Sequence, residues 1–214
     1  MGLICGIDEA GRGPVIGPMI MAGVLIDEKK TTALSELGVK DSKLIPKEKR
    51  ELLYDKILKI VHKFHIIVLT PKEIDDALLS ENMNLNWLEA KAQAEILEKL
   101  SPKKAYIDCP SVNTEAFCNY LKGNLAHQVE IVMEHGADKK YLAASAASIL
   151  AKVTRDREIK KLQHEHGDFG SGYPSDAKTK EFIKDNHELP IFRRSWKPWQ
   201  KIQESKKQRS LGDF

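Results

Sequence analysis

The chain has 214 residues and a mass of 24.1 kDa, of which 42% are hydrophobic and 30% are charged. This size and balance are typical of one globular domain, with or without a small appendage. The longest uncharged run, residues 13–26, contains two prolines and is shorter than the roughly 20 apolar residues that cross a bilayer, so we expect no membrane span. The net charge of +3 divides into −2 over residues 1–150 and +5 over residues 151–214. A basic C-terminal third suits a polyanionic partner, although a solvated helix face explains the same charges.

The N-terminus and the cysteines indicate the compartment. The first residues contain no basic segment before an apolar one, so we expect no signal peptide. The three cysteines, Cys5, Cys109 and Cys118, form no CxxC pair and are odd in number. This favours reduced thiols in the cytoplasm and argues against a thiolate metal site.

Apolar runs and amphipathic stretches alternate along the chain, which predicts an α/β fold with a mixed sheet and a helical C-terminal appendage. A glycine-rich turn at residues 11–14 joins the first two expected strands. Residues 143–148 carry almost only small side chains, which would let a helix lie very close to the sheet. We expect strands at residues 3–7, 19–26, 64–69, 105–107 and 129–133, and helices at residues 46–61, 71–79, 85–100, 141–162 and 176–187.

Four acidic residues lie at or near the ends of apolar runs. Asp8 and Glu9 follow the first run, Asp108 ends the fourth expected strand, and Asp138 precedes the helix with small side chains. Carboxylates that meet at such positions repel one another unless a cation binds them. Oxygen ligands without nearby cysteine or histidine indicate Mg²⁺ or Mn²⁺. Two such ions can stabilise both the attacking and the leaving oxygen of phosphoryl transfer.

Two considerations weaken this interpretation. A single aspartate at a strand end is most often a turn cap. Moreover, neighbouring residues of a regular strand point to opposite faces, so Asp8 and Glu9 cannot both face one ion from such a strand. We therefore expect Glu9 to act through a twist or bulge, or through its backbone carbonyl.

The glycine-rich segment at residues 11–17 is no dinucleotide-binding loop. Its glycine spacing differs from GxGxxG, and Pro14 and Pro18 stand where that motif begins a helix. The glycines do allow bare main-chain N–H groups to approach a ligand, with Arg12 among them. A plain hairpin turn would explain the glycines but not the adjoining acidic pair.

Six segments, taken together and in this order, closely resemble type 2 ribonuclease H. The resemblance implies a ribonuclease-H-like fold, with a five-stranded mixed sheet flanked by helices and a C-terminal helical extension. The segments are residues 6–18 (GIDEAGRGPVIGP), 39–43 (VKDSK), 106–108 (YID), 135–141 (HGADKKY), 146–153 (AASILAKV) and 170–176 (GSGYPSD).

The resemblance also implies an activity, namely cleavage of RNA in RNA/DNA hybrids and incision 5′ of ribonucleotides embedded in duplex DNA. Its two-metal mechanism would give 5′-phosphate and 3′-hydroxyl ends. By position, Asp8, Glu9, Asp108 and Asp138 match the family's metal-binding and catalytic acids. The resemblance also implies substrate-binding residues. Gly11, Arg12 and Gly13 match the loop that reads the ribose 2′-hydroxyl, and Tyr173 matches the aromatic residue that packs on the sugar at the RNA–DNA junction. Ser42 and Lys43 match a segment that contacts phosphate.

The last seven residues form a separate signal. Gln208, Leu211 and Phe214 have the spacing of the short peptide that docks on the sliding clamp PCNA, and archaeal members of the family look similar there. One 3₁₀ turn would place Leu211 and Phe214 on the same side, although a frayed terminus is the simpler interpretation. We expect a monomer, with a catalytic domain at residues 1–166 and a C-terminal extension at residues 167–214.

Other candidates are weaker. We interpret Asp156 as a surface ion-pair former, and Trp196 and Trp199 as residues that attach the C-terminal segment to the core. Two alternatives to a ribonuclease H remain: another two-metal nuclease of the same fold, and a non-catalytic nucleic-acid-binding module that uses the basic tail.

Overall fold

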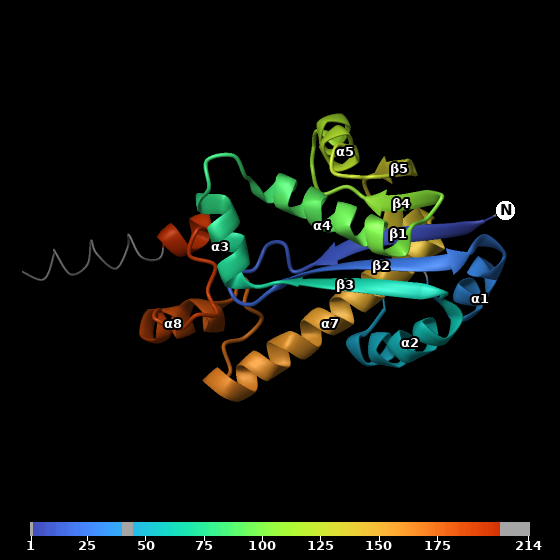
Figure 1. Cartoon of the computed structure of the whole chain (residues 1–214). Helices are drawn as coiled ribbons and strands as arrows, with labels where there is room; N and C mark the ends of the chain where they lie inside the picture. Colours follow the sequence, from blue (N-terminus) through green and yellow to red (C-terminus); the bar gives the residue numbers. More distant parts are fainter. Residues whose placement is uncertain (1, 40–44, 202–214) are drawn as a thin grey trace, which may run out of the picture.

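The computed structural model describes residues 2–39 and 45–201 and contains a five-stranded sheet with the order β3-β2-β1-β4-β5 (Figure 1). β1 pairs antiparallel with β2, and β2 with β3, whereas β1 and β4 and then β4 and β5 pair in parallel. The expected mixed sheet is therefore confirmed. The strands are β1 (Leu3–Ala10), β2 (Met19–Asp27), β3 (Lys63–Leu69), β4 (Lys104–Asp108) and β5 (Glu130–Glu134).

The helices cover both faces of this sheet (Figure 1). α1, α2 and α7 share an apolar cluster with one face, and α3, α4 and α5 share another with the opposite face. A 3₁₀ turn at Glu28–Lys30 follows β2. The helices are α1 (Thr31–Glu36), α2 (Lys47–Ile60), α3 (Pro71–Leu79), α4 (Leu85–Leu100), α5 (Thr114–Lys122), α6 (Ala137–Lys140), α7 (Leu142–His166) and α8 (Ala177–Asn186).

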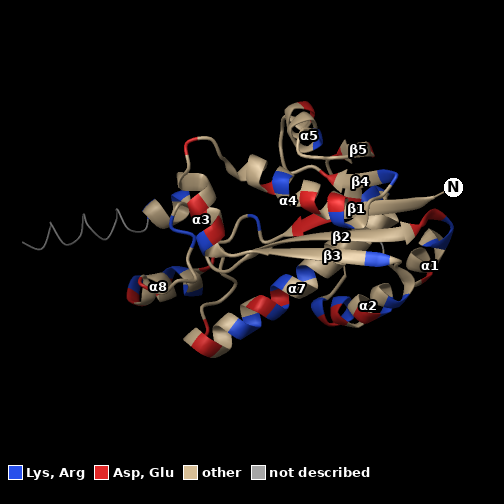
Figure 2. Cartoon of the chain, in the orientation of Figure 1, with Lys and Arg blue, Asp and Glu red and all other residues tan. Residues whose placement is uncertain are grey.

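α7 lies unusually close to the sheet. A side chain at Gly6 of β1 would overlap the main chain of Ala143 and Ala144, and residues 143–151 of α7 are all buried. The close approach predicted from the small side chains is thus confirmed. Further along α7, basic and acidic residues alternate along the helix (Figure 2).

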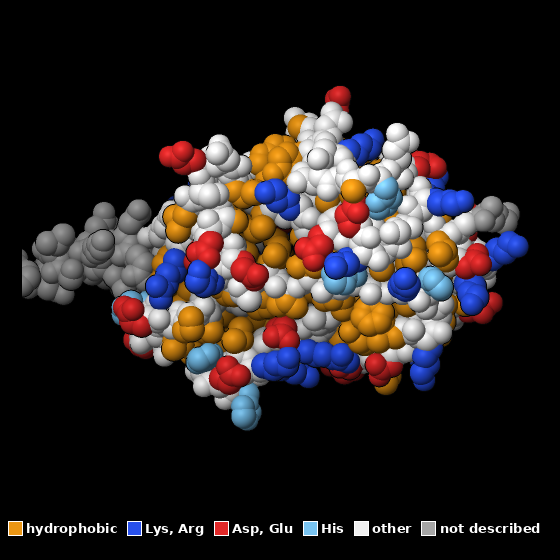
Figure 3. Space-filling view, in the orientation of Figure 1, with side chains coloured by type: hydrophobic (Ala, Val, Ile, Leu, Met, Phe, Trp, Pro, Cys, Tyr) orange, Lys and Arg blue, Asp and Glu red, His pale blue; other side chains and the backbone are white. Residues whose placement is uncertain are grey.

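The edge strand β3 is partly open to solvent. Phe64 and Val68 of this strand keep a substantial part of their side chains exposed. Figure 3 shows hydrophobic side chains interspersed with charged ones across the face that carries β3. Within the described ranges, no helix is long and apolar enough to cross a membrane.

The C-terminal segment packs against the turn between β1 and β2. Phe169, Ile183 and Phe192 form an apolar cluster with Val15 and Ile16 of that turn. Trp199 is buried and stacks on Phe192 with ring centroids 4.7 Å apart, and Trp196 borders the same cluster. The interpretation that both tryptophans attach this segment to the core is confirmed.

Three short helices, α1, α5 and the four-residue α6, were not predicted from the sequence, and β1 is longer than expected. α5 has only nine residues, of which Phe117 and Leu121 are buried, and α1 has six residues with only Leu34 buried. Such short apolar stripes are weak signals because helix periodicity needs more turns to show. β1 continues three residues beyond its apolar run, so Asp8 and Glu9 lie within a strand and not after it.

Candidate active site

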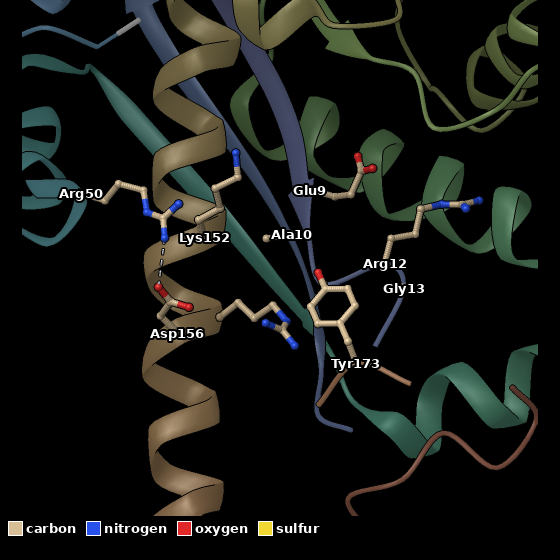
Figure 4. Close-up of a pocket in the computed structure, with 10 residues that line it drawn as sticks. Glu9, Ala10, Arg12, Gly13, Arg50, Lys152, Asp156 and Tyr173 are labelled. Carbon is tan, nitrogen blue, oxygen red and sulfur yellow. Dashed lines mark hydrogen bonds and ion pairs between the residues drawn. The ribbon is translucent and has the colours of Figure 1, made fainter. Parts of the chain in front are cut away.

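A cleft of about 370 Å³ opens where β1 ends (Figure 4). The glycine loop, defined as residues 11–13, forms one wall, and side chains from α2 and α7 form the other. Tyr173 stands between the two walls (Figure 4). The lining residues are Glu9, Ala10, Gly11, Arg12, Gly13, Arg50, Lys152, Arg155, Asp156 and Tyr173.

Asp8 is buried on the α7 side of the sheet, with 5% of its surface exposed. Its Oδ1 atom accepts a hydrogen bond of 2.8 Å from the backbone N–H of Glu9. Burial, together with the charge of Asp108, raises the pKa of Asp8 to about 7, although a hydrogen bond from Ser148 opposes the shift. Asp8 is therefore ready to bind a positive charge that would compensate for its lost hydration.

Glu9 points away from Asp8. The β1–β2 ladder runs without interruption through Asp8, Glu9 and Ala10, so β1 contains no bulge at this position. The Oε2 atom of Glu9 is buried and has no hydrogen-bond partner among the described residues. Burial raises the pKa of Glu9 well above its usual value, and the charges of Asp8, Glu89 and Asp108 act in the same direction.

Asp108 and Asp138 come from segments that contact each other. β4 ends at Asp108, and its Oδ1 atom accepts a hydrogen bond of 2.9 Å from the backbone N–H of Ala137 at the start of α6. Asp138 follows in α6 with only 1% of its surface exposed, and neither of its carboxylate oxygens has a partner among the described residues. A buried carboxylate without a donor is costly unless a ligand satisfies it.

The four predicted acids are not gathered into a finished metal site. Within the described ranges, no group of three or more His, Cys, Asp or Glu side chains is arranged to hold a metal ion. Asp8, Glu9 and Asp108 influence one another electrostatically, and Asp138 is joined to them through the contact of its neighbour Ala137 with Asp108. The donor set still suits a hard divalent cation, because it consists of carboxylate oxygens, several of them without a partner.

Arg193 holds the glycine loop from the C-terminal segment. Its guanidinium donates hydrogen bonds to the carbonyl oxygens of Gly11 (2.6 Å), Arg12 (3.0 Å) and Gly17 (3.0 Å), and it is completely buried. Trp196 adds a contact of 3.3 Å from its Nε1 atom to the carbonyl oxygen of Gly13. Arg193 belongs to the basic C-terminal third, for which the sequence suggested a polyanionic partner or a solvated helix face, but its guanidinium is enclosed and meets main-chain carbonyl oxygens instead. Nothing in the sequence distinguishes it from its neighbour Arg194.

Arg12 reaches away from the cleft toward α4 (Figure 4). Its Nε atom lies 2.8 Å from Oε1 of Glu89, and its Nη2 atom donates to Oδ1 of Asn86 at 2.9 Å. Burial raises the pKa of the Glu89 carboxyl to about 7, although the Arg12 charge opposes this shift. Sequence analysis overlooked Glu89 because an acid inside an amphipathic helix normally lies on the solvent face.

Tyr173 lies beside the glycine loop, as its predicted role requires. A Cβ atom placed on Gly13 would lie 3.5 Å from the Tyr173 ring, and 41% of the tyrosine surface is exposed. The backbone of Gly172 accepts hydrogen bonds from Val15 and Ile16, which fixes this turn against the loop. The structure therefore brings Tyr173 and residues 11–13 together.

Cations from α2 and α7 border the other side of the cleft. Asp156 lies 3.5 Å from Arg50 and 3.6 Å from Lys47, so its predicted role as an ion-pair former is confirmed, with partners from α2. Arg155 is largely buried, and its Nε and Nη2 atoms have no hydrogen-bond partner among the described residues. Its guanidinium lies 5.6 Å from the centre of the Tyr173 ring.

The remaining predicted site residues lie outside the described ranges. These are Ser42, Lys43, Gln208, Leu211 and Phe214.

Comparison with known proteins identifies the family. The family model described as Ribonuclease HII matches residues 5–199. A protein named Ribonuclease HII from Pyrococcus horikoshii is 43% identical over 220 aligned positions, which cover 99% of this chain and 98% of the relative. The chain belongs to the ribonuclease HII family.

Solved structures of ribonuclease HII relatives agree with this assignment. The crystal structure of the ribonuclease H2 from P. horikoshii OT3 has a TM-score of 0.86 and 43% identity, with coverage of 95% of this chain and 98% of the other. The ribonuclease HII in a PCNA:RNase HII complex from Archaeoglobus fulgidus has a TM-score of 0.82 and 39% identity, with coverage of 91% and 95%. The expected ribonuclease-H-like α/β fold and the expected enzyme class, a ribonuclease H endonuclease, are thereby confirmed.

Proposed function

We propose that this ribonuclease H cleaves the RNA strand of RNA/DNA hybrids and incises duplex DNA on the 5′ side of an embedded ribonucleotide. The observation that carries this proposal is the position of the glycine loop, which directly follows the carboxylates of β1 and lies beside Tyr173. The 2′-hydroxyl distinguishes RNA from DNA, and main-chain N–H groups can bind it without reading the base. Tyr173 then supplies an apolar surface for the sugar beside the loop.

The proposed catalytic and metal-binding residues are Asp8, Glu9, Asp108 and Asp138. Their oxygen donors suit Mg²⁺ or Mn²⁺, and such an ion, when bound, supplies positive charge for the attacking and leaving oxygens of phosphodiester hydrolysis. Asp8 faces α7 and Glu9 faces the α4 side of a strand without a bulge, so Glu9 would meet an ion held by Asp8 through its backbone carbonyl. Lys152 and Arg155, which line the cleft, would attract the phosphate backbone.

A labelled DNA duplex with one ribonucleotide tests this proposal, together with an all-DNA duplex of the same sequence. We expect cutting 5′ of the ribose with Mg²⁺ or Mn²⁺, none with EDTA, and none of the all-DNA control. Cutting of the control as well would favour another nuclease of this fold. Binding without cutting would favour a non-catalytic module.

Substitution of single acids tests their roles. Asp108→Asn or Asp138→Asn should abolish turnover and leave duplex binding largely intact, because each removes a charge needed by a cation but little surface. Weakened folding with an unchanged specific activity of the folded fraction would contradict the assignment.

We also propose that the C-terminal residues Gln208, Leu211 and Phe214 dock on a sliding clamp. Support comes from their spacing and from the relative of known structure that forms a complex with PCNA. Removal of residues 208–214 should spare catalysis and abolish clamp binding; an unchanged affinity for PCNA would refute this part. The cytoplasmic location, the monomeric state and the division of the chain at residue 166 stay predictions.

A further inference from the structure

The side chain of Arg12 is held by the protein itself. Two of its donors point at α4, where Nε meets Oε1 of Glu89 at 2.8 Å and Nη2 meets Oδ1 of Asn86 at 2.9 Å. Figure 4 shows the guanidinium on the far side of the loop from Tyr173 and Lys152. Because Arg193 holds the carbonyl oxygen of the same residue, Arg12 is fixed at both its side chain and its main chain.

Glu89 is an unusual partner because it is completely buried. Its Oε2 atom has no hydrogen-bond partner among the described residues, so the contact with Arg12 is its main compensation. A buried carboxylate adds little net stability, since its desolvation offsets the attraction to its partner. The buried Glu89 carboxylate is better explained by its effect on geometry, because it fixes the position of Arg12.

Asn86 extends the contact toward the carboxylates. Its Nδ2 atom donates to Oγ of Ser111 at 3.3 Å, and the same oxygen accepts from the backbone N–H of Asn113 at 3.2 Å. Ser111 is buried and stands three residues after Asp108, where β4 ends. A chain of hydrogen bonds therefore joins the glycine loop, the first turn of α4 and the segment that follows Asp108.

The held side chain leaves the main chain of the loop facing the cleft. Within residues 2–39 and 45–201, no hydrogen bond occupies the backbone N–H groups of Arg12 and Gly13. These donors can meet a 2′-hydroxyl only if the loop keeps one conformation. A released arginine would instead contact phosphates, which DNA and RNA share, and such contacts raise affinity without selecting for ribose.

We propose that Glu89 and Asn86 are positioning residues for ribonucleotide recognition: they hold Arg12 on α4 so that the loop presents main-chain N–H groups, and not the guanidinium, to the ribose. This inference rests on the proposed function. It assigns Arg12 a structural role at the site. The alternative explanation is that the Arg12 side chain contacts the substrate directly.

The experiment compares Glu89→Ala, Asn86→Ala, Arg12→Ala and the double variant Glu89→Ala/Arg12→Ala with the full chain. Two quantities are measured: kcat/KM for incision of a duplex with one ribonucleotide, and the ratio of Kd values for the all-DNA and ribonucleotide duplexes in EDTA. Each single variant should lower both quantities by about tenfold, and the double variant should lose no more than either single one, as expected for residues that act as a unit. The Kd for the all-DNA duplex should stay unchanged or become tighter.

Two further variants separate positioning from folding. Glu89→Gln keeps an acceptor for Arg12 and should restore most of the ribonucleotide preference. Gln93→Ala is the matched control, because Gln93 is also buried on α4 and its amide atoms have no partner among the described residues. It should lower the melting temperature and leave the Kd ratio unchanged.

Three results would overturn the inference: a normal Kd ratio in folded Glu89→Ala and Asn86→Ala, additive losses in the double variant, or an equal loss in Gln93→Ala. Each of these leaves the proposed function intact if the wild-type chain incises at the ribonucleotide. A wild-type chain without ribonucleotide preference would overturn both.

Discussion

The two faces of the sheet are packed in different ways. On the α7 face, Gly6 of β1 lies against the main chain of Ala143 and Ala144, so strand and helix meet backbone to backbone. On the α4 face, Gly23 of β2 lies against the side chains of Ile96 and Leu100. Main-chain contacts allow no adjustment, whereas side chains can move by a rotamer change.

This difference corresponds to what each helix contributes to the cleft. α7 supplies Ser148 and Lys152, which act on Asp8, and Lys152 and Arg155 line the cleft directly. α4 supplies Asn86 and Glu89, which do not line the cleft themselves and which bind Arg12. The α7 face, where the packing is rigid, thus carries the side chains whose distance from the carboxylates matters most.

The largest effect should come from Gly6→Ala. Its new methyl group would overlap the main chain of Ala143, so α7 must move as a whole, and we expect a loss of at least about 3 kcal/mol in the free energy of unfolding. Incision should fall even in the folded fraction because Lys152 and Arg155 move with the helix. Chemical denaturation together with kcat measures both effects.

Gly23→Ala is the matched substitution on the other face. There the obstacle is the side chain of Ile96, so a loss of about 1–2 kcal/mol is expected, with kcat close to that of the wild type. Equal losses for the two alanine variants would show that the faces do not differ in the way described.

The fold could be predicted well from the sequence because its signals are local. The apolar runs of the five strands and the small side chains at residues 143–148 each identify one element and one contact. The short helices α1 and α5 could not be predicted, since they have too few turns to show a period. The C-terminal limit of β1 was also misjudged, because Asp8 and Glu9 look like residues that end a strand.

The candidate site, like the fold, has some features that could be predicted from the sequence and others that could not. The carboxylates, residues 11–13 and Tyr173 are adjacent in sequence to recognisable motifs, and the structure places the loop and Tyr173 together. The roles of Arg193, Arg155 and Glu89 depend on burial. Those of Glu89 and Arg193 also depend on hydrogen-bond partners that lie 77 or more residues away in the sequence. No sequence pattern shows which arginine of a basic segment will be enclosed.

Arg193→Met should have the next largest effect. It leaves three carbonyl oxygens of residues 11, 12 and 17 without their donor, which should cost about 3 kcal/mol and lower the melting temperature by about 6–12 °C. Ribonucleotide preference should fall as well, because the loop loses its second support. Arg194→Met is the control: its side chain donates to the carbonyl oxygen of Glu188, away from the loop, and a loss as large as that of Arg193→Met would contradict the assignment.

Arg155→Met tests the α7 face without a large change in stability. Arg155 is buried beside the Tyr173 ring, and two of its nitrogen atoms donate no hydrogen bond to any described residue, so its removal ends a desolvation penalty and should change stability by less than about 1 kcal/mol. Nucleic-acid affinity should fall roughly tenfold, and the slope of log K against log salt should decrease by about 1 if Arg155 meets a phosphate. An unchanged salt slope would mean that Arg155 serves only to hold Tyr173.

The smallest effect concerns pH and compares one carboxyl group from each face. Burial raises the pKa of Asp8, on the α7 face, from 3.8 to about 7, and that of Glu89, on α4, from 4.5 to about 7. Between pH 4 and 7 these two groups keep protons in the folded chain that they release in the unfolded chain, so their contribution to stability falls as the pH rises through this window. The slope contributed by one such group is at most about 1.4 kcal/mol per pH unit.

In EDTA, Asp8→Asn should reduce this slope and lose little else, because an asparagine oxygen can still accept from the N–H of Glu9. Glu89→Gln should reduce it less, since the Arg12 charge already stabilises the ionised form. Denaturation curves at several pH values measure both slopes, and a larger change for Glu89→Gln than for Asp8→Asn would mean that Glu89 is the more strongly perturbed of these two acids.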